Sequence, residues 1–374
     1  MIYLDNAATS FPKPKEVITA VNNAMTNYSN PGRGSYKYSY DAAIVVEQAR
    51  NTIADMLKCD SESIIFTLNC TDGLSCAIFG TLKKGDHVLT TIFEHNSVLR
   101  PLEFLKQHGI IDYDCVAPNE SGNYDYKCFD GYIKKNTAML ITTHVSNTCG
   151  KVIDIKSIYD FCKSKRIIYC VDAAQSAGSI EIDATMADII CLPGHKGLLG
   201  PMGCGAMYLS PNIDPIPIRM GGTGSESESL MQPFFRPDRY ESGTLPFPAI
   251  MGLDQGVKLV KDNIVKIQAH EQLLAQHLTA ELLKIKKVKI YTEEACRSGI
   301  VLFNICKTDS RIVSTTLADK FKIATRGGFH CAPLAHKYLG TLEQGGVRVS
   351  FGINNNQSHV EELVYAIKSM IGSL

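Results

Sequence analysis

The run Ala138-Met139-Leu140-Ile141 is apolar at four consecutive positions, and it indicates the fold class. A strand with one face in water alternates apolar and polar residues, so a continuous apolar run predicts a strand buried on both faces. Similar short β-rich runs recur between residues 60 and 210, separated by helix-like or polar stretches. These runs occupy residues 63–68, 87–92, 114–117, 138–145, 166–172, 187–193 and 205–209. The alternation predicts an α/β domain with a mainly parallel sheet, whose ligands bind beyond the carboxyl ends of its strands.

The pattern changes after Pro246-Phe247-Pro248. Apolar residues at helical spacing predict one long amphipathic helix over residues 249–287. A strand at 299–305 and a final amphipathic helix at 359–371 follow. Because 374 residues exceed what one core usually serves, we expect two domains. The expected domains are a large one at 15–247 and a small one at 248–374 that includes the N-terminal segment 1–14.

Charge and cysteine content narrow the class of protein. Lysine plus arginine equals aspartate plus glutamate at 38 each, which gives no electrostatic reason to expect nucleic acid or an anionic membrane as a partner. The first residues lack the pattern of a signal peptide and no run is apolar enough to span a bilayer, so we expect a cytoplasmic protein. The 13 cysteines are odd in number and contain no C-x-x-C pair, which argues against structural disulfides and a zinc knuckle. We expect no metal.

Two charged residues follow neighbouring strands of the predicted sheet. Asp172 ends one buried strand, and Lys196 follows the next in Leu192-Pro193-Gly194-His195-Lys196-Gly197. An amine at the rim of an apolar sheet is desolvated, which lowers its pKa and frees a neutral nucleophile. A lysine paired with an aspartate in this way is typical of a site for pyridoxal 5′-phosphate (PLP), where the acid faces the pyridine nitrogen.

Together with further motifs, these two residues make the sequence resemble the class V aminotransferases, and within them the cysteine desulfurase and selenocysteine lyase type. The resemblance covers nearly the whole chain and implies the PLP-dependent transferase fold type I, with a mainly parallel seven-stranded sheet and a smaller α+β C-terminal domain. The motifs that carry it stand in the family's order. They are Tyr3-Leu4-Asp5-Asn6-Ala7-Ala8-Thr9, Asn30-Pro31-Gly32-Arg33-Gly34, Cys70-Thr71-Asp72-Gly73, Glu94-His95-Asn96-Ser97, Val145-Ser146-Asn147, Asp172-Ala173-Ala174-Gln175, Gly194-His195-Lys196, Glu241-Ser242-Gly243-Thr244, Arg326-Gly327-Gly328-Phe329-His330-Cys331 and Arg348.

The resemblance assigns roles around the cofactor ring. Lys196 looks like the lysine to which PLP is attached and the base that moves the Cα proton of the substrate. Asp172 would keep the ring nitrogen protonated, and His95 would stack on the ring and transfer protons. Gln175 would donate a hydrogen bond to the ring's phenolic oxygen, with Asn147 nearby.

The resemblance also indicates a phosphate site. Thr71 and Asp72 follow a strand at the start of a predicted helix, where backbone N–H groups bind anions. His195 is the expected side-chain partner. Thr244 resembles a residue that reaches the phosphate from the other subunit, so a homodimer is expected.

Cys331 is the cysteine with catalytic context, in a segment bounded by glycine and proline. Adjacent His330 and nearby Arg326 are expected to favour its thiolate, which is the reactive form. Arg348 would bind the substrate carboxylate through two parallel N–H bonds. The resemblance adds Asn30 and Arg326 as substrate-binding residues. The implied reaction converts L-cysteine to L-alanine and leaves the sulfur on Cys331 as a persulfide.

Three positions depart from the family pattern. Pro193 stands where relatives often carry serine or threonine, Asp72 replaces the usual glutamate, and Phe329 sits where many relatives have histidine. The short spacing from Cys331 to Arg348 resembles the subgroup with a short, ordered cysteine loop. Enzymes of that subgroup usually need an acceptor protein to take the sulfur.

Several other functions remain open on sequence alone. A selenocysteine lyase uses almost the same residues on L-selenocysteine, and an aminotransferase would share the scaffold without needing Cys331. The cluster Gly221-Gly222-Thr223-Gly224 is the one feature that suggests a nucleotide-binding oxidoreductase, and it does not follow a clear first strand as the dinucleotide fingerprint requires. A PLP-binding or sulfur-carrier protein without turnover is the last alternative.

Overall fold

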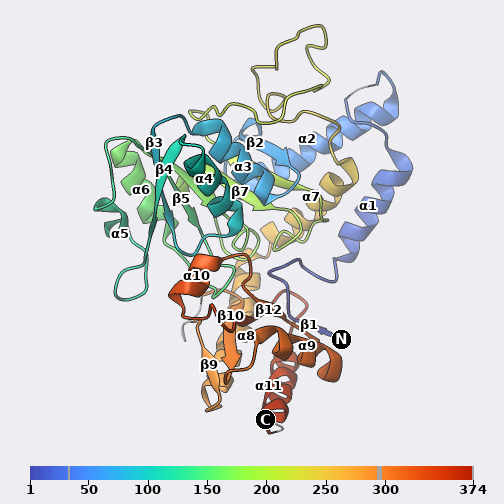
Figure 1. The fold of residues 1–374 in the computed structure, drawn as a ribbon. Helices are drawn as coiled ribbons and strands as arrows, with labels where there is room; N and C mark the ends of the chain where they lie inside the picture. Colours follow the sequence, from blue (N-terminus) through green and yellow to red (C-terminus); the bar gives the residue numbers. More distant parts are fainter. Residues whose placement is uncertain (33, 293–296, 373–374) are drawn as a thin grey trace.

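The computed structural model describes residues 1–372 except residues 33 and 293–296. Its largest element is a seven-stranded sheet of order β2-β8-β7-β6-β5-β3-β4 (Figure 1). The strands are β2 (Ile64–Thr67), β3 (Asp86–Thr91), β4 (Ile111–Val116), β5 (Thr137–Thr143), β6 (Ile168–Asp172), β7 (Ile189–Pro193) and β8 (Gly205–Leu209). Only β8 runs antiparallel to its neighbours, β2 and β7, so the predicted mainly parallel sheet is confirmed. Arg33 of the motif at 30–34 lies outside the described residues.

All seven predicted strands are present, and one of them is longer than predicted. Strand β4 begins at Ile111 rather than at residue 114. It is the edge strand beside β3, and the positions between its two buried ends are exposed or only partly buried. A half-exposed edge strand does not produce a continuous apolar run, so its first half carries no clear signal.

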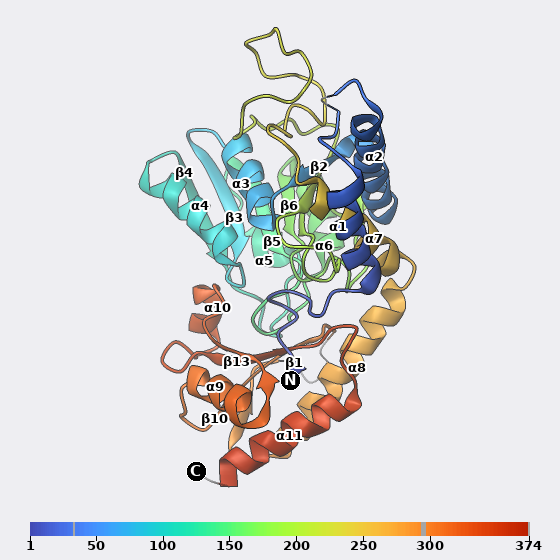
Figure 2. The same ribbon diagram turned by 90° about the vertical axis from the view of Figure 1, so that its right-hand side faces the viewer.

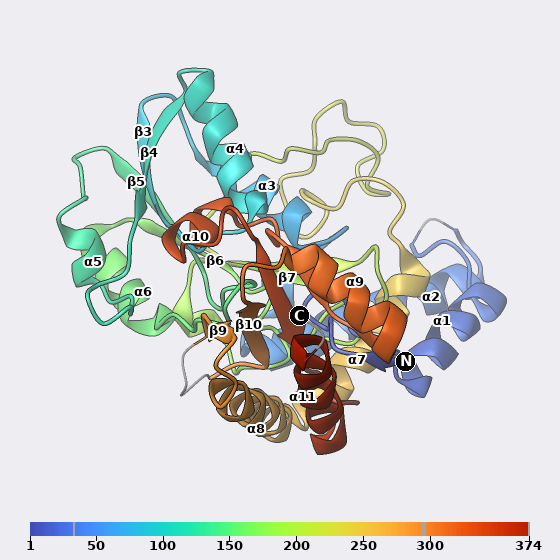
Figure 3. The same ribbon diagram turned by 60° about the horizontal axis from the view of Figure 1, so that its bottom comes forward.

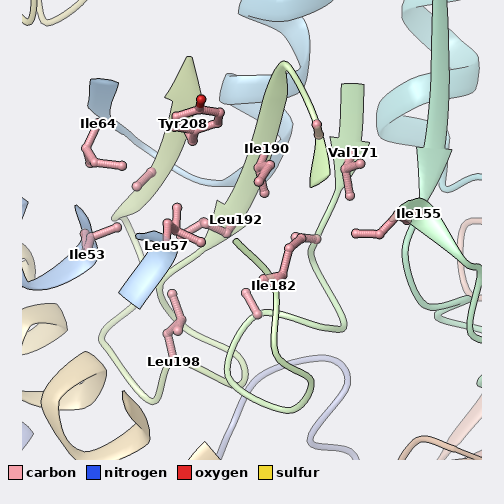
Figure 4. Packing of buried hydrophobic residues seen from close by; sticks show 14 of the residues in the cluster. Ile53, Leu57, Ile64, Ile155, Val171, Ile182, Ile190, Leu192, Leu198 and Tyr208 are labelled. Carbon is pink, nitrogen blue, oxygen red and sulfur yellow. The ribbon is translucent and has the colours of Figure 1, made fainter. Parts of the chain in front are cut away.

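Helices cover both faces of the large sheet. One face packs against α2 (Lys37–Leu57), α6 (Ile155–Lys165) and α7 (Phe247–Lys261), with α1 (Lys15–Asn27) outside them. Figure 4 shows this apolar layer, where Leu57 of α2 meets Leu192 of β7. The other face packs against α3 (Cys70–Thr81) and α4 (Asn96–Gln107). Burial on both faces is the physical reason for the apolar runs.

The predicted single helix over 249–287 is wrong, because the segment forms α7 and a second helix, α8 (Ile264–Leu283). The break falls at Asp262-Asn263, where the Asn263 side chain donates to the carbonyl oxygen of Leu259. Such local side-chain bonds compete with the helix. Both helices carry apolar residues at helical spacing, which hides the break in the sequence. Figures 2 and 3 show α8 running on to lie beside α11 (Gln357–Gly372).

A smaller antiparallel sheet follows α8. Its strands, in order across the sheet, are β12 (Arg326–Gly328), β13 (Gly346–Ser350), β10 (Ile300–Ile305) and β9 (Val288–Ile290). A second apolar cluster joins this sheet to α8, α9 (Ser310–Phe321) and α11. The N-terminal strand β1 (Ile2–Tyr3) pairs with β11 (Ile323–Ala324), which ties the start of the chain to this part of the molecule. The remaining helices are α5 (Lys127–Asp130) and α10 (Pro333–Tyr338). The division into domains at residues 247 and 248 stays a prediction.

Between β8 and α7 the chain forms a long excursion without helix or strand, which extends from the top of the molecule in Figure 1. The cluster Gly221-Gly222-Thr223-Gly224 lies within it, neither directly after a strand nor at the start of a helix. It therefore lacks the context of a dinucleotide site. Within the described part of the chain, none of the helices combines the length and apolar character that crossing a bilayer requires.

A buried ion pair fastens the end of this excursion to the sheet. Arg50 on α2 meets Glu241 through two bonds, Nη1–Oε1 at 2.7 Å and Nη2–Oε2 at 2.9 Å. Glu241 also accepts from the backbone N–H of Phe66 at 2.6 Å, and Arg50 donates to the carbonyl oxygen of Ile64. Glu241, the first residue of the motif Glu241-Ser242-Gly243-Thr244, therefore has a structural role. Its bonds to α2 and β2 fix the chain three residues before Thr244.

Replacing Glu241 by glutamine is expected to lower the free energy of unfolding by about 3 kcal/mol, because the buried charge of Arg50 loses its buried counter-ion. Urea denaturation measures the loss. Arg50 also contacts Glu47, whose side chain is 54 % exposed, so Glu47→Gln is the matched control. The control is expected to cost less than about 1 kcal/mol. Equal losses in the two variants would contradict a structural role for the buried pair.

Candidate active site

The candidate site lies at the carboxyl ends of three parallel strands. The pairing register sets Thr143 of β5 level with Asp172 of β6, and Asp172 level with Cys191 of β7. A pocket opens at this edge, where parallel sheets place their ligands. Its lining comprises Asn69, Cys70, Thr71, Leu74, His95, Ser97, Thr143, Asn147, Asp172, Ala174, Gln175, Pro193, His195 and Lys196. Seven residues predicted for the cofactor are therefore brought together: Thr71, His95, Asn147, Asp172, Gln175, His195 and Lys196.

Lys196 lies in a tight turn directly after β7. The backbone carbonyl of the preceding His195 accepts hydrogen bonds from Thr9 Oγ1, from the N–H and Oγ of Ser10, and from Lys13 Nζ. The N-terminal segment therefore holds the turn in place. Burial lowers the pKa of the Lys196 amine, and Asp172 opposes that shift. Within the described residues its Nζ makes no hydrogen bond, so the amine is left for a ligand.

Asp172 is 3 % exposed and its carboxylate is held on one side. Oδ1 accepts from the backbone N–H of Ala174 at 2.8 Å and from Sγ of Cys70 at 3.3 Å. Within the described part of the chain, Oδ2 accepts no hydrogen bond. One oxygen is thus committed to the protein, and the other is left for a ligand.

A chain of hydrogen bonds orients His95. Its Nδ1 accepts from the backbone N–H of Ser97 at 3.0 Å, which caps α4. The neutral ring therefore carries its proton on Nε2. Burial lowers the pKa of His95, so this neutral form is favoured. Ser97 Oγ lies 2.8 Å from both His95 Nδ1 and Thr71 Oγ1, which links the ring to the start of α3.

The predicted phosphate residues divide into two groups. Thr71 and His195 line the pocket, and Nδ1 of His195 is buried without a partner among the described residues. The carboxylate of Asp72 instead accepts from the N–H of Leu68 and pairs with Arg219 at 2.9 Å, so it is directed away from the pocket. The N–H of Asp72 is capped by Asn69. Repulsion between a carboxylate and a phosphate explains why Asp72 is paired elsewhere.

Asn30 and Thr244 do not line this pocket. Asn30 borders a different hollow beside α2, together with Gly243 and Leu245, and that hollow shares no residue with the first. Thr244 is exposed. Within one chain, therefore, these two predicted residues are not part of the site.

Two amides connect the pocket to the rest of the chain. Gln175 Nε2 donates to the carbonyl oxygen of Ala7 at 3.0 Å, which leaves its second N–H available. Asn147 Nδ2 donates to the carbonyl oxygen of His330 at 2.6 Å. Asn147 therefore joins the cofactor pocket to the cysteine loop.

The Cys331 loop is docked against the pocket by its backbone. The carbonyl oxygen of Cys331 accepts from the N–H of Asn96 at 2.8 Å, next to His95. His330 and Cys331 both have left-handed backbones, with φ of 51° and 56°. Non-glycine residues adopt this conformation at a cost, and only where contacts hold it. The side chain of Cys331 is exposed at the surface.

The expectation that His330 favours the Cys331 thiolate is wrong. His330 Nε2 lies 3.1 Å from the carbonyl oxygen of Arg326, and Nδ1 lies 3.2 Å from Nε2 of His336. Burial lowers its pKa well below the usual value, so the ring is neutral and offers no positive charge. His336 in turn contacts Thr341 Oγ1 at 2.7 Å. The two rings anchor the loop. Of the two residues expected to favour the Cys331 thiolate, Arg326 is the one left as a cation.

Arg348 is 1 % exposed and lies behind Asn147. Nη1 donates to the carbonyl oxygen of Asn147 at 2.9 Å, and Nη2 donates to Asp5 Oδ1 at 2.7 Å. Its buried Nε has no partner among the described residues. Arg326 has an exposed side chain, and neither arginine is among the residues that line the pocket. Their predicted substrate roles stay predictions.

Sequence reasoning gave no role to Ser97, Cys70 or His336. Ser97 stands in the quoted motif Glu94-His95-Asn96-Ser97, two residues after His95, which is capping distance at a helix start. Cys70 begins the motif Cys70-Thr71-Asp72-Gly73. His336 carried no signal, because its contact with His330 is formed only when the loop folds.

The residues in the pocket fit PLP. An amine that has a lowered pKa and no partner among the described residues can be attached to the aldehyde, and the free Oδ2 of Asp172 can accept from the ring nitrogen. The unpartnered Nδ1 of His195 and the start of α3 can bind a phosphate. Fold and site together define an α/β enzyme built to use this cofactor.

Comparisons with known proteins agree. Residues 2–363 match the model of the aminotransferase class-V family. A probable cysteine desulfurase of Methanothermobacter thermautotrophicus is 32 % identical, over 99 % of this chain and 95 % of the relative. One of Pyrococcus abyssi is also 32 % identical, over 100 % of this chain and 95 % of that relative. The apo structure of cysteine desulfurase from Thermococcus onnurineus NA1 is 30 % identical, with a TM-score of 0.93, and the match covers 100 % of this chain and 95 % of that one.

The chain therefore belongs to the aminotransferase class-V family, whose cofactor is PLP. It is a homologue of the cysteine desulfurases within that family. The fold predicted from the resemblance is confirmed.

Borohydride reduction of the protein with bound PLP is expected to fix the cofactor on Lys196, as seen by mass spectrometry of a digest. Lys196→Ala is expected to abolish the label. Lys13 is the matched control, because burial lowers its pKa to about 8 but it does not line the pocket. Lys13→Met is expected to keep the label on Lys196. A label on another lysine of the wild type would contradict the assignment.

Proposed function

We propose that this protein is a cysteine desulfurase, which converts L-cysteine to L-alanine and takes the sulfur on Cys331 as a persulfide. The observation that carries the proposal is the contact of the Cys331 backbone with Asn96, next to the pocket residue His95. This contact holds the Cys331 backbone next to the pocket, which supports a role for its thiol in the reaction. An aminotransferase has no use for such a thiol. The relatives described as cysteine desulfurases support the same substrate.

Bound PLP supplies an electron sink that stabilises negative charge on the Cα carbon of an amino acid. The residues of the chain do the remaining work. The lowered pKa favours the neutral form of the Lys196 amine, and that form can accept the Cα proton. With PLP bound, Oδ2 of Asp172 would accept a hydrogen bond from the protonated ring nitrogen. His95, with its proton on Nε2, borders the same space and can donate a hydrogen bond there.

Sulfur transfer is the task of Cys331. Its thiolate attacks the sulfur of the substrate, so that an S–S bond forms while the Cβ–S bond of the substrate breaks. The electron pair of the broken bond remains on the carbon fragment, which takes up protons and leaves as alanine. The sum is L-cysteine plus the Cys331 thiol giving L-alanine plus the Cys331 persulfide. No external oxidant or reductant is needed.

Arg348 is the proposed ligand of the substrate carboxylate. Its unpartnered Nε–H, buried behind Asn147, is a donor that a carboxylate would satisfy. Asp5 and the carbonyl oxygen of Asn147 hold the other side of the guanidinium in place. Arg326 is the proposed second cation on the exposed side.

The persulfide needs an acceptor, which we propose is a protein. The loop backbone is tied down at the carbonyl oxygens of both His330 and Cys331, so it does not carry the sulfur far. The Cys331 side chain is exposed, which suits a partner that approaches it.

Alanine release from L-cysteine, in the presence of reductant, tests the activity. Cys331→Ala is expected to lose at least about 100-fold in rate, because the nucleophile is missing. Cys306 is the other exposed cysteine of the described residues, so Cys306→Ala is the matched control and is expected to retain activity. Undiminished turnover of L-cysteine by Cys331→Ala would contradict the proposal. Alanine from L-selenocysteine alone, surviving that change, would identify a selenocysteine lyase.

We propose further that the enzyme is a homodimer in which Asn30 and Thr244 serve the partner's pocket. Both lie away from the pocket of their own chain, and the buried Oδ1 of Asn30 has no partner among the described residues. Thr244 is exposed beside Gly243, which borders the same hollow as Asn30.

Mixing two inactive variants tests this arrangement. Thr244→Glu is expected to abolish activity, because its carboxylate repels the phosphate, and Lys196→Ala is inactive by loss of the amine. A mixed dimer contains one pocket with an intact lysine faced by an intact Thr244. The mixture is therefore expected to recover about a quarter of wild-type activity, if subunits exchange at random. Absence of recovery, with mixed dimers verified by mass, would contradict a role across the interface.

A further inference from the structure

Cys70 is a pocket residue without an assigned role. It is the first residue of α3 and lines the pocket together with Lys196 and His95. Its Sγ lies 3.3 Å from Asp172 Oδ1 and 3.3 Å from the carbonyl oxygen of Cys191. A thiol has one proton, so it can donate to only one of these acceptors at a time.

The environment keeps this sulfur a donor rather than a nucleophile. Burial, and then the nearby Asp172 carboxylate, raise the pKa of the Cys70 thiol well above its usual value. The group therefore stays protonated and does not compete with Cys331 for the substrate's sulfur. Beside a carboxylate, such a protonated thiol is suited to donating a hydrogen bond.

The hydrogen bonds of Asp172 indicate what that donation achieves. Oδ1 is held from two sides, by the Ala174 N–H and by the Cys70 thiol, whereas Oδ2 has no partner among the described residues. A carboxylate held at one oxygen cannot exchange its two oxygens by rotation without losing both bonds. The second oxygen therefore keeps a fixed direction.

We propose that Cys70 is a positioning residue for the cofactor: its S–H···Oδ1 bond orients Asp172 so that Oδ2 is kept for the ring nitrogen. The thiol thereby raises the affinity for PLP and keeps the ring nitrogen protonated. The inference concerns cofactor binding and does not depend on the identity of the amino-acid substrate.

Two measurements on the protein with bound PLP test the proposal: the dissociation constant of PLP, and the 15N resonance of PLP labelled at the ring nitrogen, which reports its protonation. In Cys70→Ala we expect the dissociation constant to rise roughly threefold to tenfold, as for the loss of one hydrogen bond from a weak donor. The 15N resonance is expected to move toward the unprotonated position. Cys70→Ser retains a donor and is expected to restore both values.

Cys76 provides the matched control, because it lies on the same helix and, like Cys70, is 8 % exposed. Cys76→Ala is expected to leave both readouts at the wild-type value. If the cavity in Cys70→Ala destabilises the chain, Cys70→Val fills the space without a donor and is expected to reproduce the loss.

A wild-type dissociation constant and 15N resonance in Cys70→Ala would overturn the proposal, and would mean that the thiol donates to the Cys191 carbonyl instead. Equal losses in Cys70→Ala and Cys70→Ser would also overturn it, because packing rather than the donor would then matter. Neither readout involves cysteine turnover. A failed desulfurase assay and a failed Cys70 test are therefore distinguishable.

Discussion

The parallel register of β5, β6 and β7 is the constraint on which the rest of the site depends. It sets the end of β5 level with the end of β6, so Asp172 is flanked by Thr143 of β5 on one side and by Cys191 of β7 on the other. Burial of both faces of the sheet leaves the carboxyl edge as the place where polar side chains can face a ligand. The turn that carries Lys196 begins at this edge, and its position is fixed by four hydrogen bonds to one carbonyl oxygen of His195.

The second half of the site comes from the far end of the chain. Asn147 donates to His330, Asn96 donates to Cys331, and Arg348 contacts both Asn147 and Asp5. These bonds join residues that are far apart in sequence. They connect the Cys331 loop to the pocket that contains Lys196. Neutral His330 and His336 belong to this connection, because uncharged rings can be buried under the loop at low cost.

Features that depend on adjacent residues were predicted correctly from the sequence. Features that depend on contacts with distant segments were not. The seven strands were predicted from apolar runs. The start of β4 was predicted at residue 114 instead of Ile111, because this edge strand is only half-buried. One helix was predicted where α7 and α8 stand, since periodicity continues across Asp262. Family motifs identified seven pocket residues, although the carboxylate of Asp72 pairs with Arg219 outside the pocket.

The sequence by itself determined the α/β class, the family, and the residue types available for PLP chemistry. These properties can be recognised from runs and motifs of a few adjacent residues. The tertiary structure alone decided that His330 is neutral, that Cys70 touches Asp172, and that Asn30 and Thr244 lie away from the pocket of their own chain. Such properties depend on burial and on contacts between distant segments, and neither exists until the chain has folded.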